Sequence, residues 1–307
     1  MDPLNRRFRV IAFDWDGTAV TSRSAPAHDV KHRLEPLMAH DVACVVITGT
    51  HLGNVNPNFC QLVEPSLRRH LYACVNRGSE AYGFDAGGEL LTLHQRVATD
   101  EENAAMDRIA IEMRDEVRAE YGLEIGIVFD RMNRRKIDLI PLPEWADPPK
   151  AMIGELLVAT EKRLHKAGIE RGIKQLIDRL ADKATASGID LRITSDVKHL
   201  EFGLTDKSDS VRYVLRELAR PRGVPNEEIL ILGDEFGPIS GFEGSDFRTF
   251  IDEAQGATYV SVGKEPNGAP EGVIHYGKGI PGFMELMDHQ RALWEQYERT
   301  RGGDRRD

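Results

Sequence analysis

The stretch Val10-Ile11-Ala12-Phe13-Asp14-Trp15-Asp16-Gly17-Thr18 joins a short apolar run to two closely spaced carboxylates. Four apolar residues that end directly in an aspartate predict a strand of a parallel sheet, buried on both faces. Open α/β sheets bind their ligands at the carboxyl ends of such strands, where Asp14 and Asp16 are expected. Residues two apart in an extended segment face the same side, so the two carboxylates can address one substrate. Gly17 then permits a sharp turn away from the strand.

The same pattern returns along the chain and predicts an α/β protein. Four further short apolar runs end in polar or glycine residues, and we interpret them as strands of the same buried sheet. They are Val42–Ile47 before Thr48, Leu71–Val75 before Asn76, Ile229–Leu232 before Gly233-Asp234, and Ala257–Val262 before Gly263. Because these runs fall into an early and a late group, the predicted core is discontinuous in sequence.

The residues between the two groups have the pattern of a separate α/β unit. From Asp100 to Tyr121, apolar residues recur at spacings of three and four, which is typical of an amphipathic helix. The pattern then predicts two strands around the basic turn Arg131–Arg135, two helices and two more strands: Leu123–Asp130, Lys136–Leu142, Lys150–Lys166, Ile173–Ala186, Leu191–Thr194 and Leu200–Leu204. A unit of about 100 residues is a usual domain size. We therefore expect a core over residues 1–98 and 204–307 and an inserted domain over residues 99–203.

The paired carboxylates of the first strand predict a metal ion. Asp14 and Asp16 repel each other when both are ionised, so they need a cation or a strongly tuned environment. Magnesium prefers oxygen ligands and commonly bridges a few carboxylates to a substrate phosphate. Asp234 ends the late strand at the same edge of the sheet and is the obvious further ligand. Asp246 follows closely in sequence and is expected to support the metal.

Two other segments supply groups that suit a phosphate. Thr48 ends the second strand, where its hydroxyl and the amides of Gly49 and its neighbours are expected to donate hydrogen bonds to phosphate oxygens. Lys207 supplies positive charge and directly precedes a helical pattern, whose N-terminus favours an anion. Together these residues predict phosphoryl transfer.

The basic turn of the inserted domain has two interpretations. Arg131, Arg134 and Arg135 can grip a distal phosphate or carboxylate of the substrate through their guanidinium forks. A solvated surface turn explains the same residues equally well. The three arginines are therefore candidate substrate-binding residues.

This ordered set of residues resembles the four motifs of the haloacid dehalogenase-like superfamily. The matching segments are Asp14-Trp15-Asp16-Gly17-Thr18, then Thr48, then Lys207, then Gly233-Asp234 with Ser245-Asp246. The resemblance implies a Rossmann-like parallel-sheet core. It also implies that the insertion is an α/β cap that determines substrate specificity, as in the sugar-phosphatase and phosphomannomutase branches.

The resemblance also implies a role for each motif residue. Asp14 forms an aspartyl-phosphate intermediate, and Asp16 acts first as general acid and then as general base. Thr48 and Lys207 steady the phosphoryl group. Asp14, the backbone carbonyl of Asp16 and Asp234 bind Mg²⁺. The expected activity is a magnesium-dependent phosphatase that hydrolyses a small phosphorylated metabolite, with a sugar phosphate as the favoured class.

Departures from the family pattern leave two alternatives. Thr50 stands where many such phosphatases have arginine, and Ser245 stands where asparagine often precedes the final aspartate. Extra residues, Glu235–Glu243, lengthen the fourth motif as in phosphomannomutases. A phosphomannomutase-like phosphosugar mutase is therefore the close alternative, and we favour hydrolysis because few cap residues match the mutase pattern. A binding protein that has lost catalysis is disfavoured because Asp14 and Asp16 are both present.

Composition excludes several other classes of protein. The formal net charge is −10, which disfavours the broad positive field that nucleic-acid binding usually needs. No run reaches the roughly 18 apolar residues of a membrane span, so we expect a cytoplasmic protein without a membrane partner. The three cysteines, Cys44, Cys60 and Cys74, have no metal-ligand spacing and are predicted to be reduced core residues.

Overall fold

The computed structural model describes residues 3–23, 25–146, 152–238 and 242–303. The chain forms two compact units. We call the first the core unit: Met1–Gln95, Lys207–Pro238 and Glu243–Asp307. We call the second the inserted unit: Arg96–Asp206 and Ile239–Phe242.

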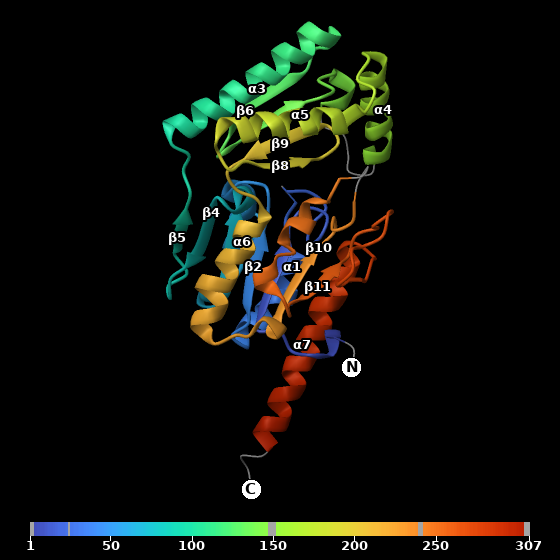
Figure 1. Ribbon diagram of the computed structural model, residues 1–307. Coiled ribbons are helices and arrows are strands. Elements are labelled where there is room, and N and C mark those ends of the chain that lie inside the picture. The colour runs from blue at the N-terminus through green and yellow to red at the C-terminus, as the bar shows by residue number, and fades with distance from the viewer. Residues whose placement is uncertain (1–2, 24, 147–151, 239–241, 304–307) are drawn as a thin grey trace. The chain divides into compact units, whose positions relative to one another are not determined.

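The described part of the core unit contains one eight-stranded sheet (Figure 1). Its order across the sheet is β12 (Val273–His275), β11 (Thr258–Ser261), β10 (Ile229–Gly233), β1 (Val10–Asp14), β2 (Ala43–Ile47), β3 (Leu71–Val75), β4 (Glu80–Phe84) and β5 (Leu90–Gln95). The strands from β12 to β3 are parallel, whereas β4 and β5 form an antiparallel hairpin at one edge. The parallel sheet predicted from the apolar runs is confirmed.

The core strands carry apolar side chains on both faces because helical segments cover both. Ile11 and Phe13 of β1 belong to a cluster with α1 (His28–Ala39) and α7 (Ile280–Gly303). Val10 and Ala12 belong to a second cluster with residues of α6 (Lys207–Tyr213) and of the π-helical turn Val214–Ala219 that continues it. The alternation of side chains along a strand produces this division. Asp14 is two residues after Ala12, so its side chain lies on the same face of the sheet as Val10 and Ala12, which is the face that α6 covers.

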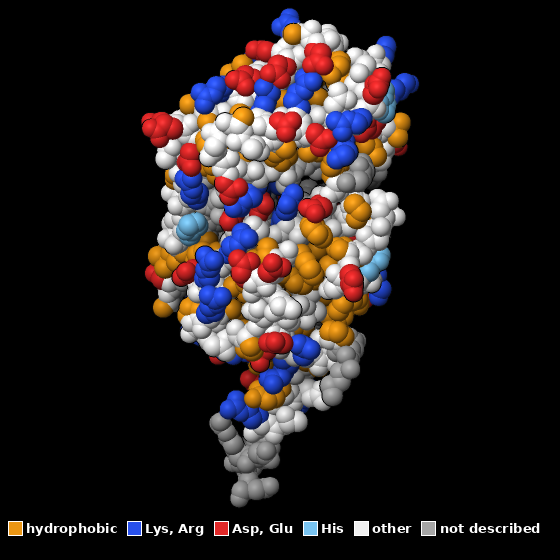
Figure 2. Space-filling view, in the orientation of Figure 1, with side chains coloured by type: hydrophobic (Ala, Val, Ile, Leu, Met, Phe, Trp, Pro, Cys, Tyr) orange, Lys and Arg blue, Asp and Glu red, His pale blue; other side chains and the backbone are white. Residues whose placement is uncertain are grey.

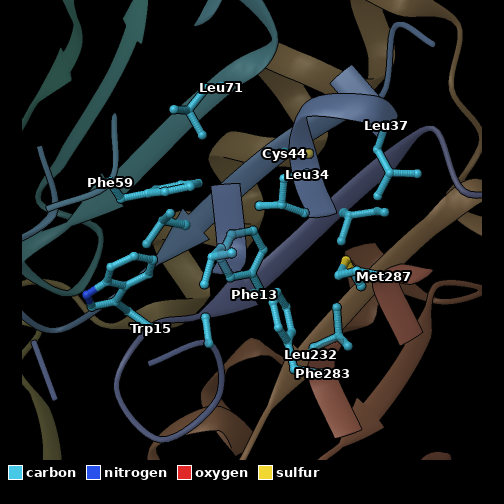
Figure 3. Close-up of a cluster of buried hydrophobic side chains, with 14 of the residues drawn as sticks. Phe13, Trp15, Leu34, Leu37, Cys44, Phe59, Leu71, Leu232, Phe283 and Met287 are labelled. Atoms are coloured by element: carbon cyan, nitrogen blue, oxygen red, sulfur yellow. The ribbon is translucent and has the colours of Figure 1, made fainter. Parts of the chain in front are cut away.

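Trp15 fixes the chain where it leaves β1. Its side chain is fully buried, and its ring centroid lies 5.3 Å from that of Phe59. Figure 3 shows both rings in the cluster that contains Phe13, Leu34 and Phe283. An aromatic side chain of this size contributes a large buried area. Trp15 therefore holds the backbone between the two aspartates against the apolar core.

The inserted unit is a two-layer α/β structure. Its antiparallel sheet has the order β6 (Gly126–Arg131), β7 (Arg134–Asp138), β9 (His199–Gly203) and β8 (Arg192–Ser195). Three helices pack with it around a common apolar cluster: α3 (Asp100–Tyr121), α4 (Ile153–Lys166) and α5 (Gly172–Ser187). The structure thus confirms the predicted fold class, a Rossmann-like core sheet with an inserted α/β unit. The predicted start of α4 at Lys150 lies outside the described residues.

Helix α3 matches its predicted bounds because its ends are marked by local chemistry. The Thr99 side chain accepts a hydrogen bond from the Glu102 amide, and the Glu102 carboxylate accepts one from the Thr99 amide, which together form a capping box. At the other end Gly122 adopts a left-handed φ of 60°.

The predicted basic turn is shorter in the structure. Strands β6 and β7 are joined by Met132 and Asn133 alone, and Asn133 has a φ of 59°. Asparagine tolerates this left-handed conformation better than most other residues, which suits it to a tight turn. As a result Arg134 and Arg135 lie in a strand instead of a loop.

Acidic and basic side chains are interspersed on the face that Figure 2 shows. Within the described residues, no helix has the length and hydropathy that crossing a membrane requires. Cys44, Cys60 and Cys74 are buried and unpaired with one another, as predicted.

Candidate active site

Three strand ends bring the first site residues together. Strand β1 lies between β10 and β2, and all three run parallel. Asp14 is the last residue of β1, whereas Thr48 and Asp234 directly follow β2 and β10. In the register, Asp14 pairs with Ile47 and Phe13 with Leu232. The carboxyl ends of the three strands therefore meet at one edge of the sheet, as the sequence predicts.

The loop after β1 is a tight turn. The carbonyl oxygen of Trp15 accepts hydrogen bonds from the amides of Ala19 and Val20, each at 3.1 Å. Gly17 has a φ of 92°, which a side chain would disfavour. Asp16 is half-buried in this turn and forms a backbone bridge with Val20.

Thr18 links two of the metal-ligand candidates, Asp14 and Asp234, and had no assigned role in the sequence analysis. Its Oγ1 lies 3.0 Å from Oδ1 of Asp234 and 3.3 Å from Oδ2 of Asp14, so its hydroxyl can donate to either carboxylate. The side chain is fully buried. The signal was present in the sequence, since a threonine hydroxyl four residues after Asp14 returns to the strand end when the intervening loop is tight.

Lys207 joins two carboxylates in the interior of the core unit. Its Nζ donates to Oδ1 of Asp14 at 2.6 Å and to Oδ1 of Asp246 at 2.7 Å. Burial alone would lower the pKa of this lysine, but the two carboxylates outweigh burial and raise the pKa above its ordinary value. Lys207 is therefore a charged ammonium at neutral pH.

Asp246 connects this lysine to the loop after β10. Its Oδ2 accepts hydrogen bonds from the backbone amides of Asp234 and Glu235, both at 2.9 Å. Burial alone would raise the pKa of Asp246, but Lys207 and these amides hold it below its ordinary value. A Cβ atom at Gly233 would lie 2.5 Å from Oδ2 of Asp246. Only glycine at position 233 leaves room for this carboxylate.

The Thr48 loop is held by the loop that follows β3. Thr48 is buried, and its Oγ1 accepts a hydrogen bond from the Thr50 amide at 3.2 Å across the half-buried Gly49. The carbonyls of Thr48 and Thr50 accept from the amides of Arg77 at 3.1 Å and Asn76 at 2.8 Å. The Thr48 hydroxyl oxygen accepts this hydrogen bond, so the hydroxyl proton can still rotate and donate to another acceptor.

The carboxylates of the site suit a divalent cation. Asp14, Asp234 and Asp246 each offer one oxygen atom, and these atoms lie within 4.8 Å of one another. An all-oxygen donor set is typical of the hard cations magnesium and calcium. Within this cluster, Asp14 and Asp246 both accept from Lys207 through Oδ1, and Asp246 also accepts from two backbone amides through Oδ2.

The arginines predicted to bind substrate belong to the inserted unit and have different surroundings. Arg131 is exposed. Arg134 is buried, with Nη1 lying 3.8 Å from Oε2 of Glu201, and Arg135 is buried in an ion pair with Asp107. Arg135 therefore already neutralises a carboxylate of its own unit. Substrate binding by these three residues, and by Gly49, stays a prediction.

Comparison with protein families and with curated proteins finds no match. Solved structures do match. N-terminal truncated, IMP-bound IMP-nucleotidase of Plasmodium falciparum has a TM-score of 0.58 at 9% identity, over 93% of this chain and 68% of that chain. Trehalose-6-phosphate phosphatase of Aspergillus fumigatus has a TM-score of 0.53 at 13% identity, over 93% of each chain. This chain therefore has the haloacid dehalogenase-like fold that its four sequence motifs predict.

Proposed function

We propose that this protein is a magnesium-dependent phosphatase that hydrolyses a small phosphorylated metabolite through an aspartyl-phosphate intermediate. The observation that carries the proposal is the position of Asp14. Its carboxylate ends the central strand β1 and lies 2.6 Å from the Lys207 ammonium, beside Asp234 and Asp246. A nucleophilic carboxylate next to a fixed cation and a candidate metal site fits attack on an anionic phosphorus.

In the first step, an Asp14 carboxylate oxygen attacks the phosphorus in line and the bond to the leaving oxygen breaks. Asp16 protonates that leaving oxygen. In the second step, water attacks the phosphorus of the aspartyl phosphate while Asp16 takes a proton from the water. Inorganic phosphate leaves and the Asp14 carboxylate is restored. The half-buried position of Asp16 in the turn after Asp14 is compatible with a proton carrier.

Lys207 and Thr48 have supporting roles in this proposal. The Lys207 ammonium offsets the negative charge that Asp14 and the phosphoryl group bring together. The Thr48 hydroxyl and the Gly49 amide donate to phosphoryl oxygens. Most of the catalysis would come from positioning and neutralisation, as is general for phosphoryl transfer.

Asp14, the backbone carbonyl of Asp16 and Asp234 would hold the Mg²⁺, which when bound neutralises phosphoryl oxygens. The Thr18 hydroxyl can donate to either the Asp14 or the Asp234 carboxylate and would hold the two side chains close to each other. Asp246 would support the metal, as the sequence suggests. Its Oδ1 accepts from the Lys207 ammonium and its Oδ2 accepts from the Asp234 and Glu235 amides, so Asp246 would orient both Lys207 and the Asp234 loop.

A sugar phosphate is the substrate class we favour, and the enzyme is expected in the cytoplasm. The structural neighbours are named for IMP and trehalose 6-phosphate, both phosphate monoesters of a sugar unit. The inserted unit would select among such compounds, with Arg131, Arg134 and Arg135 as the candidate contacts carried over from the sequence.

The test is a panel of p-nitrophenyl phosphate and phosphorylated sugars and nucleotides, assayed for released phosphate with Mg²⁺ and with EDTA. We expect magnesium-dependent release of phosphate from at least one sugar phosphate. An isomerised sugar phosphate without released phosphate would establish the mutase alternative. Failure on every compound with Mg²⁺ present would favour a binding protein that has lost catalysis.

A further inference from the structure

Two buried carboxylates hold the loop that follows Asp234. Four successive backbone amides, those of residues 234 to 237, each donate to one of them. The Asp234 and Glu235 amides donate to Oδ2 of Asp246, and the next two amides donate to Glu265. Asp246 belongs to the site described above. Glu265 lies beyond the four motifs and had no role in the sequence analysis.

The Glu265 side chain is fully engaged in this loop. Its Oε1 accepts from the Phe236 amide at 2.8 Å and from Oγ of Ser261 at 2.6 Å, and its Oε2 accepts from the Gly237 amide at 2.7 Å. The side chain is buried, and the residue has a φ of 43°, in the left-handed region that non-glycine residues rarely adopt. A residue held in a disfavoured conformation persists only when its surroundings determine it strongly.

Backbone packing leaves the loop little freedom. A Cβ atom at Gly263 would lie 2.9 Å from the Cα of Asp234, and one at Gly237 would lie 2.5 Å from Oε2 of Glu265. The Asn267 side chain adds a hydrogen bond to the Pro238 carbonyl at 2.7 Å. The segment after β11 therefore contacts the Asp234 loop through Gly263, Glu265 and Asn267.

We propose that Glu265 is a positioning residue that fixes Asp234 for metal binding by anchoring the loop Glu235–Pro238 to the end of β11. The proposal rests on the proposed function, because it assumes that Asp234 binds Mg²⁺. Asp246 ties the first two amides to Lys207, and Glu265 ties the next two to Ser261, the last residue of β11. Asp246 accepts hydrogen bonds only from the first two amides of this lengthened loop, so Glu265 is needed to hold the next two.

Glu265 acts through the loop and not as a ligand. Its two oxygens accept three hydrogen bonds, and it is absent from the cluster of Asp14, Asp234 and Asp246 whose oxygens approach one another. Residues that orient metal ligands typically change metal affinity by about 10–100-fold when they are replaced.

The experiment compares the wild type with Glu265→Ala, Glu265→Gln and Glu271→Ala, all as full-length protein stripped with EDTA. Glu271 is an exposed glutamate that follows the same strand, so its variant controls for lost charge. Two properties are measured without turnover: the Mg²⁺ dissociation constant by calorimetry, and hydrogen exchange of the peptide that contains residues 234–238 by mass spectrometry. Thermal unfolding is recorded for each variant.

We expect Glu265→Ala to raise the Mg²⁺ dissociation constant about 10–100-fold and to speed exchange of the Phe236 and Gly237 amides. Glu265→Gln keeps one acceptor oxygen and should lie between Glu265→Ala and the wild type. Glu271→Ala should match the wild type. If Glu265→Ala fails to fold, Glu265→Gln still gives the answer, because it keeps the size of the side chain.

Two results would overturn the inference, and they differ from failure of the proposed function. If the folded Glu265 variants have the Mg²⁺ dissociation constant of the wild type, with or without lower thermal stability, then Glu265 has only a structural role. Unchanged hydrogen exchange at the Phe236 and Gly237 amides would show that Glu265 does not anchor this loop. A wild-type protein that does not bind Mg²⁺ at all would instead refute the metal dependence of the proposed function, and this inference with it.

Discussion

Lys207 and Asp14 form a buried ion pair, with 2.6 Å between Nζ and Oδ1, although they lie 193 positions apart in the sequence. Asp14 ends the central strand, and Lys207 begins the helix that covers the same face of the sheet. A single ammonium thus joins the proposed nucleophile to Asp246 and, through it, to the loop of Asp234. Lys207 therefore offsets part of the negative charge of Asp14 and Asp246, and replacing it should have measurable effects on stability.

Replacing Asp14 by asparagine should abolish turnover and leave the fold intact. The amide has the size of the carboxylate but is a poor nucleophile, so we expect a loss of at least about 10⁴-fold in kcat. Phosphate release measures the loss, and far-UV circular dichroism checks the fold. Asp252→Asn is the matched control, because Asp252 is exposed on the same unit. Near-normal turnover by Asp14→Asn would exclude Asp14 as the nucleophile.

Replacing Lys207 by methionine should destabilise the protein as well as inactivate it. The change leaves the Asp14 and Asp246 carboxylates buried beside each other without their shared cation. Removing one partner of a buried ion pair typically costs about 3–5 kcal/mol, and we expect a loss of that size in chemical denaturation. An unfolding free energy equal to that of the wild type would show that solvent or an ion replaces the ammonium.

The Lys207 contribution to stability should also have a defined pH dependence. Because the carboxylates raise its pKa in the folded state, the stabilisation is fully present below the unfolded-state pKa of about 10.4. It is lost only as the pH rises through the higher folded-state value. Between pH 6 and pH 9, the advantage of the wild type over Lys207→Met in unfolding free energy should therefore not decrease as the pH rises. A difference that shrinks by pH 8 would contradict the raised pKa.

Much of this site was predictable from sequence because its residues follow apolar runs. Asp14, Thr48 and Asp234 lie at strand ends, and parallel strands bring such ends to one edge. The predictions failed where contacts depend on loop geometry. Glu265 reaches the Asp234 loop by a tight turn with a left-handed φ, which no periodic pattern reveals. The predicted length of the basic turn was also wrong, because Asn133 allows a connection of only two residues between β6 and β7.

Magnesium should stabilise the folded protein, and the effect should depend on Asp234. A ligand that binds only the folded state adds about 2.7 kcal/mol when its concentration is 100 times its dissociation constant. We expect thermal unfolding of the wild type to shift upward with MgCl₂, and the shift to vanish in Asp234→Asn. Sodium chloride of equal ionic strength controls for screening. An equal shift in Asp234→Asn would place the stabilising ion elsewhere.

Glycine 233 should tolerate no side chain. A Cβ atom there would lie 2.5 Å from Oδ2 of Asp246, so Gly233→Ala must displace the carboxylate that holds Lys207 and two loop amides. We expect a loss of about 1–3 kcal/mol in unfolding free energy, which is usual for overpacking, together with a large loss of turnover. Gly154→Ala is the control, because nothing lies within 4 Å of its Cβ position in α4. It should leave turnover unchanged and leave stability equal or slightly higher.

The three cysteines should resist thiol reagents in the native protein. Burial raises the pKa of Cys60 and of Cys74 to about 12, and raises that of Cys44 further. At pH 8 a thiol with a pKa of about 12 is ionised in roughly one molecule in 10⁴, and the thiolate is the reactive form. We expect iodoacetamide at pH 8 to modify none of the three in the native state and all three in urea, as counted by mass spectrometry. Rapid modification of Cys60 in folded protein would mean that the 3-10 segment Cys60–Leu62 opens locally, because burial and a raised pKa together forbid reaction from the closed state.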